Sequence, residues 1–381
     1  MDGAGFDEFV LANMPSFIAV NYQRLLETQQ PQERINLIVH IYDLLLRIVT
    51  IILVSQYLSQ ERSRVNDPFL NDLLLHKFST YDLTLDTWQK IFFTAFNVYQ
   101  GKAKLFFMPE LYEFYWDSSA VPHRPRLAVG QTIERFTQIA VGIQSEKELP
   151  QDEAGWLTLA QEIIGLLRSV LSALAFMGNY ELILVLDCDK TSYRFELHQG
   201  VTIAVGHHDL PNYPGLKPGS FYLRKGTDAF LRLHPLLMFW EGELERENLA
   251  TPDTGIYDRL IHDEQLQYLL SRSDKTIRDD NKRIVKEFLL LLQALEEIKD
   301  QHPETKKLSW WQLVETGTDI THRRMATVRG KFRNELYLQR DTTRQEFEHF
   351  LQSEKRCFVL IGKSGVGKSN FLLAVGEELR Q

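Results

Sequence analysis

Hydrophobic residues recur at helical spacing through the first half of the chain. Over residues 35–58 the apolar positions follow one another every three or four residues, and similar segments cover residues 84–99, 124–144 and 153–177. This spacing places the apolar side chains on one face of a helix. We therefore predict that residues 1–177 form an all-helical domain.

The most apolar of these segments, residues 35–58, contains His40, Asp43 and Arg47. Charged side chains are costly in the centre of a bilayer, and a membrane span needs about 20 predominantly apolar residues. We interpret this segment as a helix in the core of the protein, and we expect no association with a membrane.

The pattern changes near residue 178. Residues 180–187 (YELILVLD) form a continuous apolar run of strand length, and residues 192–197 (SYRFEL) alternate polar and apolar positions as a half-buried strand does. A loop rich in Gly and Pro is predicted for residues 206–219. Further strands are predicted at residues 220–224, 229–233, 257–261 and 266–270. Residues 178–270 therefore read as a small antiparallel β-rich domain.

Helical spacing returns in residues 274–300, and Pro303 follows as an end signal. We interpret residues 271–335 as a helical connector, in which Trp310 and Trp311 are expected to anchor packing against a neighbouring domain. Together with the segments before it, this connector predicts an α+β multidomain protein.

One motif in the chain specifies a chemistry. Residues 357–361 (CFVLI) have the character of a short strand, and residues 362–369 (GKSGVGKS) match the pattern G-x-x-x-x-G-K-[ST] of the P-loop, or Walker A motif. Residues 370–380 then read as a helix. The sequence thus predicts the strand–loop–helix that opens a P-loop NTPase domain over residues 336–381.

The spacing of the motif follows from the chemistry of a triphosphate. The expected nucleotide-binding residues are Gly362, Lys363, Ser364, Gly365, Val366, Gly367, Lys368 and Ser369. The glycines let backbone N–H groups approach the phosphates closely. Lys368 supplies a cation to the β- and γ-phosphates, and the Ser369 hydroxyl binds Mg²⁺. We therefore expect ATP and Mg²⁺ as cofactors.

Residues 336–341 (LYLQRD) stand shortly before this motif. With them the sequence resembles the STAND class of P-loop NTPases, which includes NACHT and apoptotic-ATPase proteins and carries a motif of two hydrophobic residues, Gly, Arg and Glu at this place. Gln339 and Asp341 stand where that class usually has Gly and Glu. The resemblance implies that Tyr337, Leu338 and Arg340 border the nucleotide base and help to sense the nucleotide state.

The same resemblance implies a nucleotide-dependent switch in cytoplasmic signalling or defence, with protein partners or self-association through the N-terminal domains. The chain ends twelve residues after Ser369, before any Walker B acid, so we expect it to be part of a longer ATPase and to be inactive by itself. The alternatives are a P-loop ATPase that acts on nucleic acid and a protein-interaction module without catalysis.

Charge and cysteine content narrow these possibilities. With 43 Lys and Arg against 51 Asp and Glu, the net charge of −8 does not favour nucleic acid as a partner. The two cysteines, Cys188 and Cys357, are too few for a disulfide scaffold or a Cys-rich zinc site. A reducing cytoplasm is the compartment that this composition favours.

Three weaker patterns in the sequence are candidate sites. Arg34 and His40 have the spacing found in HEPN ribonucleases, which they resemble in that respect alone, and a partly buried His40 is the favoured interpretation. The cluster His207, His208 and Asp209, with His198 and His234 not far along the chain, could supply metal ligands, but a Pro/Gly loop would not hold them in a fixed geometry. The basic residues 322–333 favour a contact between domains over nucleic acid.

Overall fold

The computed structural model describes eleven stretches of the chain. They are residues 3–59, 66–79, 83–121, 123–145, 150, 152–209, 215–240, 253–261, 264–272, 275–301 and 341–351. The chain divides into two compact units, Met1–Pro303 and Glu304–Gln381, and each is described by itself.

The first unit contains nine of the described α-helices. They are α1 (Gly3–Asn13), α2 (Ser16–Glu27), α3 (Pro31–Ser59), α4 (Pro68–Phe78), α5 (Leu85–Val98), α6 (Pro109–Tyr115), α7 (Leu127–Gln144), α8 (Glu153–Ala173) and α9 (Lys282–Gln301), with the 3-10 turns η1 (Ala103–Leu105) and η2 (Ala175–Asn179). The four helices predicted from apolar spacing correspond to α3, α5, α7 and α8. Side chains cap the N-termini of three of these helices. The Asp67 carboxylate accepts from the backbone N–H of Phe69 at 2.8 Å, Thr84 caps α5, and Asp152 caps α8.

The strands form three antiparallel sheets in the described residues. They are β1 (Trp116–Asp117), β2 (Arg124–Pro125), β3 (Glu181–Cys188), β4 (Ser192–Leu197), β5 (Ala204–Asp209), β6 (Ser220–Lys225), β7 (Ala229–Arg232), β8 (Leu237–Trp240), β9 (Asp253–Ile261), β10 (Gln265–Leu270) and β11 (Thr276–Asp279). The strand orders are β1-β2, β5-β4-β3-β6-β7 and β11-β10-β9-β8. This unit therefore combines helices with small antiparallel sheets, as the predicted α+β class requires.

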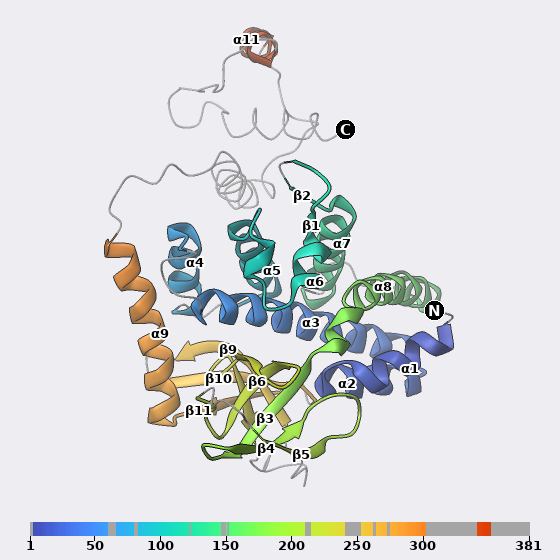
Figure 1. The fold of residues 1–381 in the computed structure, drawn as a ribbon. Helices are drawn as coiled ribbons and strands as arrows, with labels where there is room; N and C mark the ends of the chain where they lie inside the picture. Colours follow the sequence, from blue (N-terminus) through green and yellow to red (C-terminus); the bar gives the residue numbers. More distant parts are fainter. Residues whose placement is uncertain are drawn as a thin grey trace. The chain divides into compact units, whose positions relative to one another are not determined.

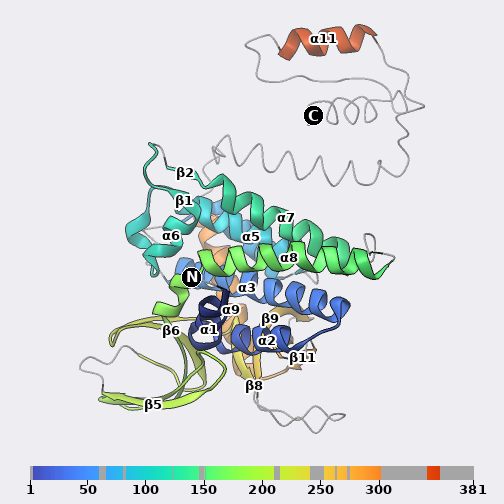
Figure 2. The same ribbon diagram turned by 90° about the vertical axis from the view of Figure 1, so that its right-hand side faces the viewer.

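Helix α3 is the axis of the first unit. It lies between the layer of helices α4 to α8 and the two larger sheets, and both views show it there (Figures 1 and 2). It is long and apolar enough to cross a membrane, but its most apolar window is entirely buried inside the protein. The structure thus agrees with the interpretation of α3 as a core helix.

Burial of both faces of strand β3 explains why its sequence is apolar without alternation. Leu182 and Leu184 point into the main hydrophobic core, whereas Ile183 and Val185 belong to a smaller cluster on the other side of the strand. A strand with both faces covered has no solvent side on which polar residues would be favoured. The β4 strand beside it, with one face more exposed, alternates.

The helices and the sheets share the main core. It includes Ile48 of α3, Phe92 of α5, Leu184 of β3, Tyr257 of β9 and Phe288 of α9, all of which are buried. The first unit therefore brings together the segments predicted separately as a helical domain, a β-rich domain and the start of a connector.

Two local predictions are wrong. The loop predicted for residues 206–219 contains most of strand β5, which pairs with β4 along its whole length, from Ser192 opposite Asp209 to Leu197 opposite Ala204. The helix predicted to begin at residue 274 is preceded by β11, which pairs with β10. In both places hydrogen bonding to a neighbouring strand decides the structure against weak local preferences.

In the second unit the structure describes helix α11 (Asp341–Leu351), which begins at the last residue of LYLQRD and precedes the P-loop motif in the sequence. The predicted strand, phosphate-binding loop and following helix lie outside the described residues.

Candidate functional site

The predicted nucleotide site lies outside the described residues. This applies to Gly362, Lys363, Ser364, Gly365, Val366, Gly367, Lys368 and Ser369, and equally to Tyr337, Leu338 and Arg340. It applies as well to Trp310, Trp311 and the basic residues 322–333. The geometry of nucleotide and Mg²⁺ binding therefore stays a prediction, and the described residues supply the charged clusters that follow.

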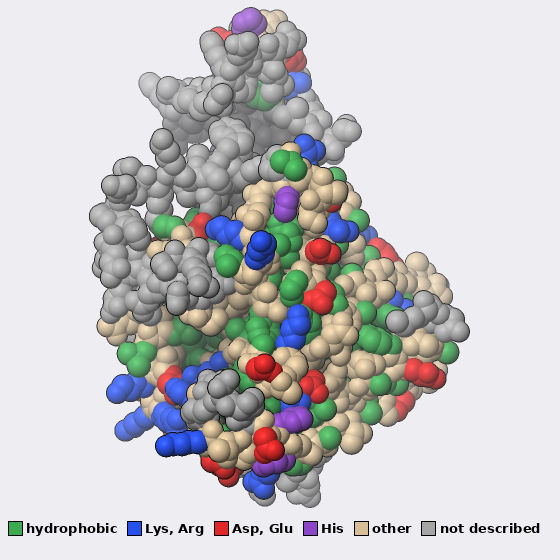
Figure 3. All heavy atoms as spheres, viewed as in Figure 1, with side chains coloured by type: hydrophobic (Ala, Val, Ile, Leu, Met, Phe, Trp, Pro, Cys, Tyr) green, Lys and Arg blue, Asp and Glu red, His purple; other side chains and the backbone are tan. Residues whose placement is uncertain are grey.

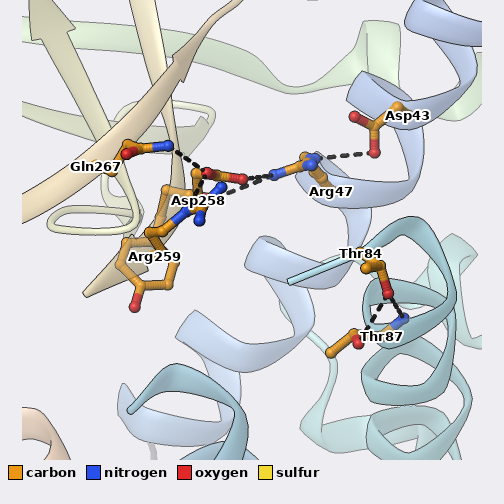
Figure 4. A network of polar contacts seen from close by, with 8 residues as sticks. Asp43, Arg47, Thr84, Thr87, Asp258, Arg259 and Gln267 are labelled. Carbon is orange, nitrogen blue, oxygen red and sulfur yellow. Dashed lines mark hydrogen bonds and ion pairs between the residues drawn. The ribbon is translucent and has the colours of Figure 1, made fainter. Parts of the chain in front are cut away.

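A buried arginine links the helices to the four-stranded sheet (Figure 4). Arg47 of α3 donates from Nε to Asp43 Oδ1 at 2.9 Å, one helical turn away. Its Nη1 lies 3.4 Å from Asp258 Oδ1 and 3.4 Å from the backbone oxygen of Tyr257, both on β9. The guanidinium also lies over the ring of Trp88, 5.4 Å from its centroid.

The sheet holds Asp258 from its other side. Gln267 of β10 donates to Asp258 Oδ2 at 2.9 Å, and Arg259 donates to the same oxygen at 3.1 Å. Burial acts to lower the pKa of Arg47, but Asp43 and then Asp258 outweigh it and raise that pKa. The arginine therefore stays charged, and its partners are protein groups. We interpret this network as a structural tie between α3 and the sheet.

A second charged cluster surrounds Glu287 of α9. Arg232, the last residue of β7, donates from Nη2 to Glu287 Oε2 at 2.9 Å, and His234 Nε2 lies 3.7 Å from the same oxygen. Glu287 Oε1 lies 3.7 Å from Lys217 Nζ and 3.8 Å from Arg283 Nε. Two basic side chains thus stand beside each carboxylate oxygen.

The charges in this cluster set the pKa values of its members. Partial burial acts to raise the pKa of Glu287, but the hydrogen bond and charge of Arg232, with Lys217, lower it on balance. Burial, reinforced by the charge of Arg232, lowers the pKa of His234 to about 4. At neutral pH the cluster therefore holds three cations, one carboxylate and a neutral imidazole.

Sequence analysis missed the cluster around Glu287. It had singled out His234 alone, and only as one of several possible metal ligands. A local signal exists, because residues 275–290 contain five Lys and Arg against three acids in a chain that is acidic as a whole. Only the tertiary structure brings β7 and α9 together, because Arg232 and Glu287 are 55 residues apart in the sequence.

The histidines considered as metal ligands do not converge. His207, His208 and Asp209 lie on the exposed strand β5, and not in a loop as expected. His207 Nε2 is 3.8 Å from Asp209 Oδ1, while the His208 ring stacks on Phe195 with centroids 5.4 Å apart. Among the residues that the structure describes, no group of three or more His, Cys, Asp or Glu side chains could hold a metal ion.

The histidine of the ribonuclease-like spacing has a structural contact. His40 Nε2 lies 2.8 Å from the backbone oxygen of Ser271, which also accepts from Asn21 Nδ2 at 2.8 Å. Helices α2 and α3 are thereby tied to the end of β10. This partly buried position is the one favoured for His40 from the sequence.

Comparisons with known proteins add no assignment: no family model matches the chain, and neither does a curated protein or a solved structure. The functional argument therefore rests on the residues themselves.

Proposed function

We propose that this chain carries the beginning of an ATP-binding P-loop NTPase domain of the STAND type, which acts as a nucleotide-dependent switch in cytoplasmic signalling or defence. The observation that supports the proposal is the sequence of residues 357–369, in which an apolar strand pattern leads directly into GKSGVGKS. The motif supplies backbone donors, a lysine and a serine in the order that a Mg²⁺-bound triphosphate needs.

The architecture of the first unit is compatible with a recognition module attached to such a switch. Its core runs from Phe6 to Leu295, and its last helix, α9, which lies in the predicted connector of residues 271–335, ends at Gln301. A compact unit with its own core presents fixed surfaces to a partner. We assign partner recognition or self-association to this unit and nucleotide binding to the residues after it.

The test is ATP binding by the full 381-residue chain, measured by fluorescence of a labelled ATP analogue with Mg²⁺ present. In the proposal Lys368 contacts the β- and γ-phosphates, and a hydrogen bond to a charged group contributes about 1.5–3 kcal/mol. The Lys368→Ala variant should therefore bind ATP roughly 10- to 150-fold more weakly. Ser369→Ala should weaken binding in Mg²⁺ while changing little in excess chelator.

The matched control is Lys363→Ala, which removes another lysine of the same loop. The motif uses only the backbone at this position, so the variant should keep its affinity for ATP. Equal affinity of the Lys368→Ala and unchanged chains would refute the P-loop assignment. No ATP binding by the unchanged chain would favour the interaction module, and tighter ATP binding on addition of single-stranded DNA would favour the nucleic-acid ATPase.

A further inference from the structure

The cluster around Glu287 has more positive charge than its carboxylate balances. The basic side chains of Lys217, Arg232 and Arg283 lie within 4 Å of that single carboxylate. Lys and Arg side chains gather around the start of α9 at the lower left of the molecule (Figure 3). In a chain of net charge −8, this local excess of cations indicates an affinity for anions.

Most of the cationic donors in the cluster do not hydrogen-bond to Glu287. Contacts of 3.7 and 3.8 Å from Lys217 and Arg283 to Glu287 are too long for hydrogen bonds, so these groups lie beside the carboxylate without donating to it. In the part of the chain that the structure describes, Arg232 donates from Nη2 to both Glu287 and Ser220 Oγ. Among the described residues, the buried atoms Arg232 Nε and His234 Nδ1 have no hydrogen-bond partner.

The start of α9 adds to the positive potential. Its first turn contains Lys282 and Arg283 and no acidic residue, although the positive end of the helix dipole favours acids there. Two acids, Asp279 and Asp280, precede the helix, and Asp279 accepts from the backbone N–H of Asn281 at 2.8 Å. The helix start therefore places Lys282 and Arg283 beside backbone N–H groups, of which the Arg283 N–H already donates to Asn281 Oδ1 at 3.1 Å.

We propose that the junction of β7 with the start of α9 is a binding site for a small phosphate-bearing ligand. A phosphate offers several acceptor oxygens and two negative charges, and the planar fork of an arginine together with a mobile lysine suits it. Lys217 and Arg283 reach the site from solvent, and Arg232 forms its base. The Glu287 carboxylate occupies the centre of the cations when no ligand is bound, and it competes with the phosphate for them. This site is independent of the P-loop.

The test uses the full chain with Lys368→Ala, so that the P-loop does not contribute, and isothermal titration calorimetry with inorganic pyrophosphate. The double change Lys217→Gln with Arg283→Gln should weaken binding about 100-fold or more, because each of the two charged contacts contributes at least about tenfold. Glu287→Gln should strengthen binding several-fold, since it removes the competing carboxylate. A purely structural role of Glu287 would give no such gain.

The control is a second double change, Lys104→Gln with Arg124→Gln, which removes two exposed cations from η1 and β2 and alters net charge equally. It should leave pyrophosphate binding unchanged. The proposal is overturned if the Lys368→Ala chain does not bind pyrophosphate, or if the two double variants bind it equally. Much tighter binding of a short single-stranded DNA that depends on Lys217 and Arg283 would also overturn the assignment to a small ligand.

Discussion

Replacement of Arg47 by methionine should be among the most damaging single changes to the first unit. It keeps the apolar stem and removes the charge that Asp43 and Asp258 share, whose side chains are only 11% and 12% exposed. Breaking a buried pair by removing one partner costs about 3–5 kcal/mol, because the other charge stays buried without compensation. For a unit of 303 residues this corresponds to a fall in melting temperature of about 5–8 °C.

The assay is thermal unfolding of the full chain, followed by far-UV circular dichroism. Arg135→Met is the matched control, because Arg135 donates to Glu162 at 2.9 Å, the same distance as the Arg47–Asp43 contact, but with side chains 58% and 45% exposed. An exposed ion pair contributes about 0–1 kcal/mol. This control should therefore lower the melting temperature by less than about 2 °C.

A triple variant distinguishes destabilisation by unpaired buried charges from destabilisation by changed packing. Asp43→Asn and Asp258→Asn, added to Arg47→Met, remove the two carboxylates that the single change leaves unpaired. The triple variant should be more stable than Arg47→Met alone, since no buried charge remains without a partner. Equal melting temperatures for Arg47→Met and Arg135→Met would refute the reasoning, and a triple variant less stable than the single one would show that packing dominates.

Two further predictions concern pH and packing. Burial lowers the pKa of His198 to about 4, so its neutral ring stabilises the fold fully above pH 6.5, and up to about 3 kcal/mol of unfolding free energy is lost as the pH falls through 4. His234 has a similarly lowered pKa, so His198→Leu should reduce, but not abolish, the dependence on pH of the unfolding free energy measured with denaturant. An unchanged dependence on pH would contradict this prediction. Gly206→Ala should lower the free energy of unfolding by about 1–3 kcal/mol, since the new Cβ would lie 2.4 Å from Phe195 Cζ. The control is Gly130→Ala in α7, where a Cβ would meet nothing within 4 Å, and it should be neutral or stabilising. Equal urea midpoints for the two variants would count against the packing argument.

The elements that were predictable are those with a simple apolar pattern in the sequence. Helix α3 was predicted from apolar residues at helical spacing, although its burial is continuous, with every residue from Ile41 to Tyr57 buried. Strand β4 was predicted because its two faces differ in exposure. Strand β5 was not, since its pattern is exposed almost throughout and contains Gly206, which leaves room for the ring of Phe195. The residues of strand β11 were included in the predicted helix over residues 274–300, because Ile277 and Ile284 also fit a helical repeat.

The two kinds of candidate site differ in the same way. The phosphate-binding loop is a local motif, whose donors lie within eight consecutive residues and can be recognised without a fold. The cluster around Glu287 depends on the ends of β7 and α9 meeting, and the Arg47 network joins residues 211 positions apart. No spacing rule connects such residues, so their roles appear only when the tertiary structure is known.

The position of α3 has a consequence for the synthesis of the protein. Asp258 leaves the ribosome about 210 residues after Arg47, which at about 5–20 residues per second is a delay of roughly 10–40 s. During that time a 29-residue apolar helix lacks the sheet that later covers it, and its length and hydropathy meet the requirements for insertion into a membrane. Asp43 and Arg47 oppose such insertion. Arg47, which later ties α3 to the sheet, therefore also helps, with Asp43, to keep the nascent chain out of the bilayer.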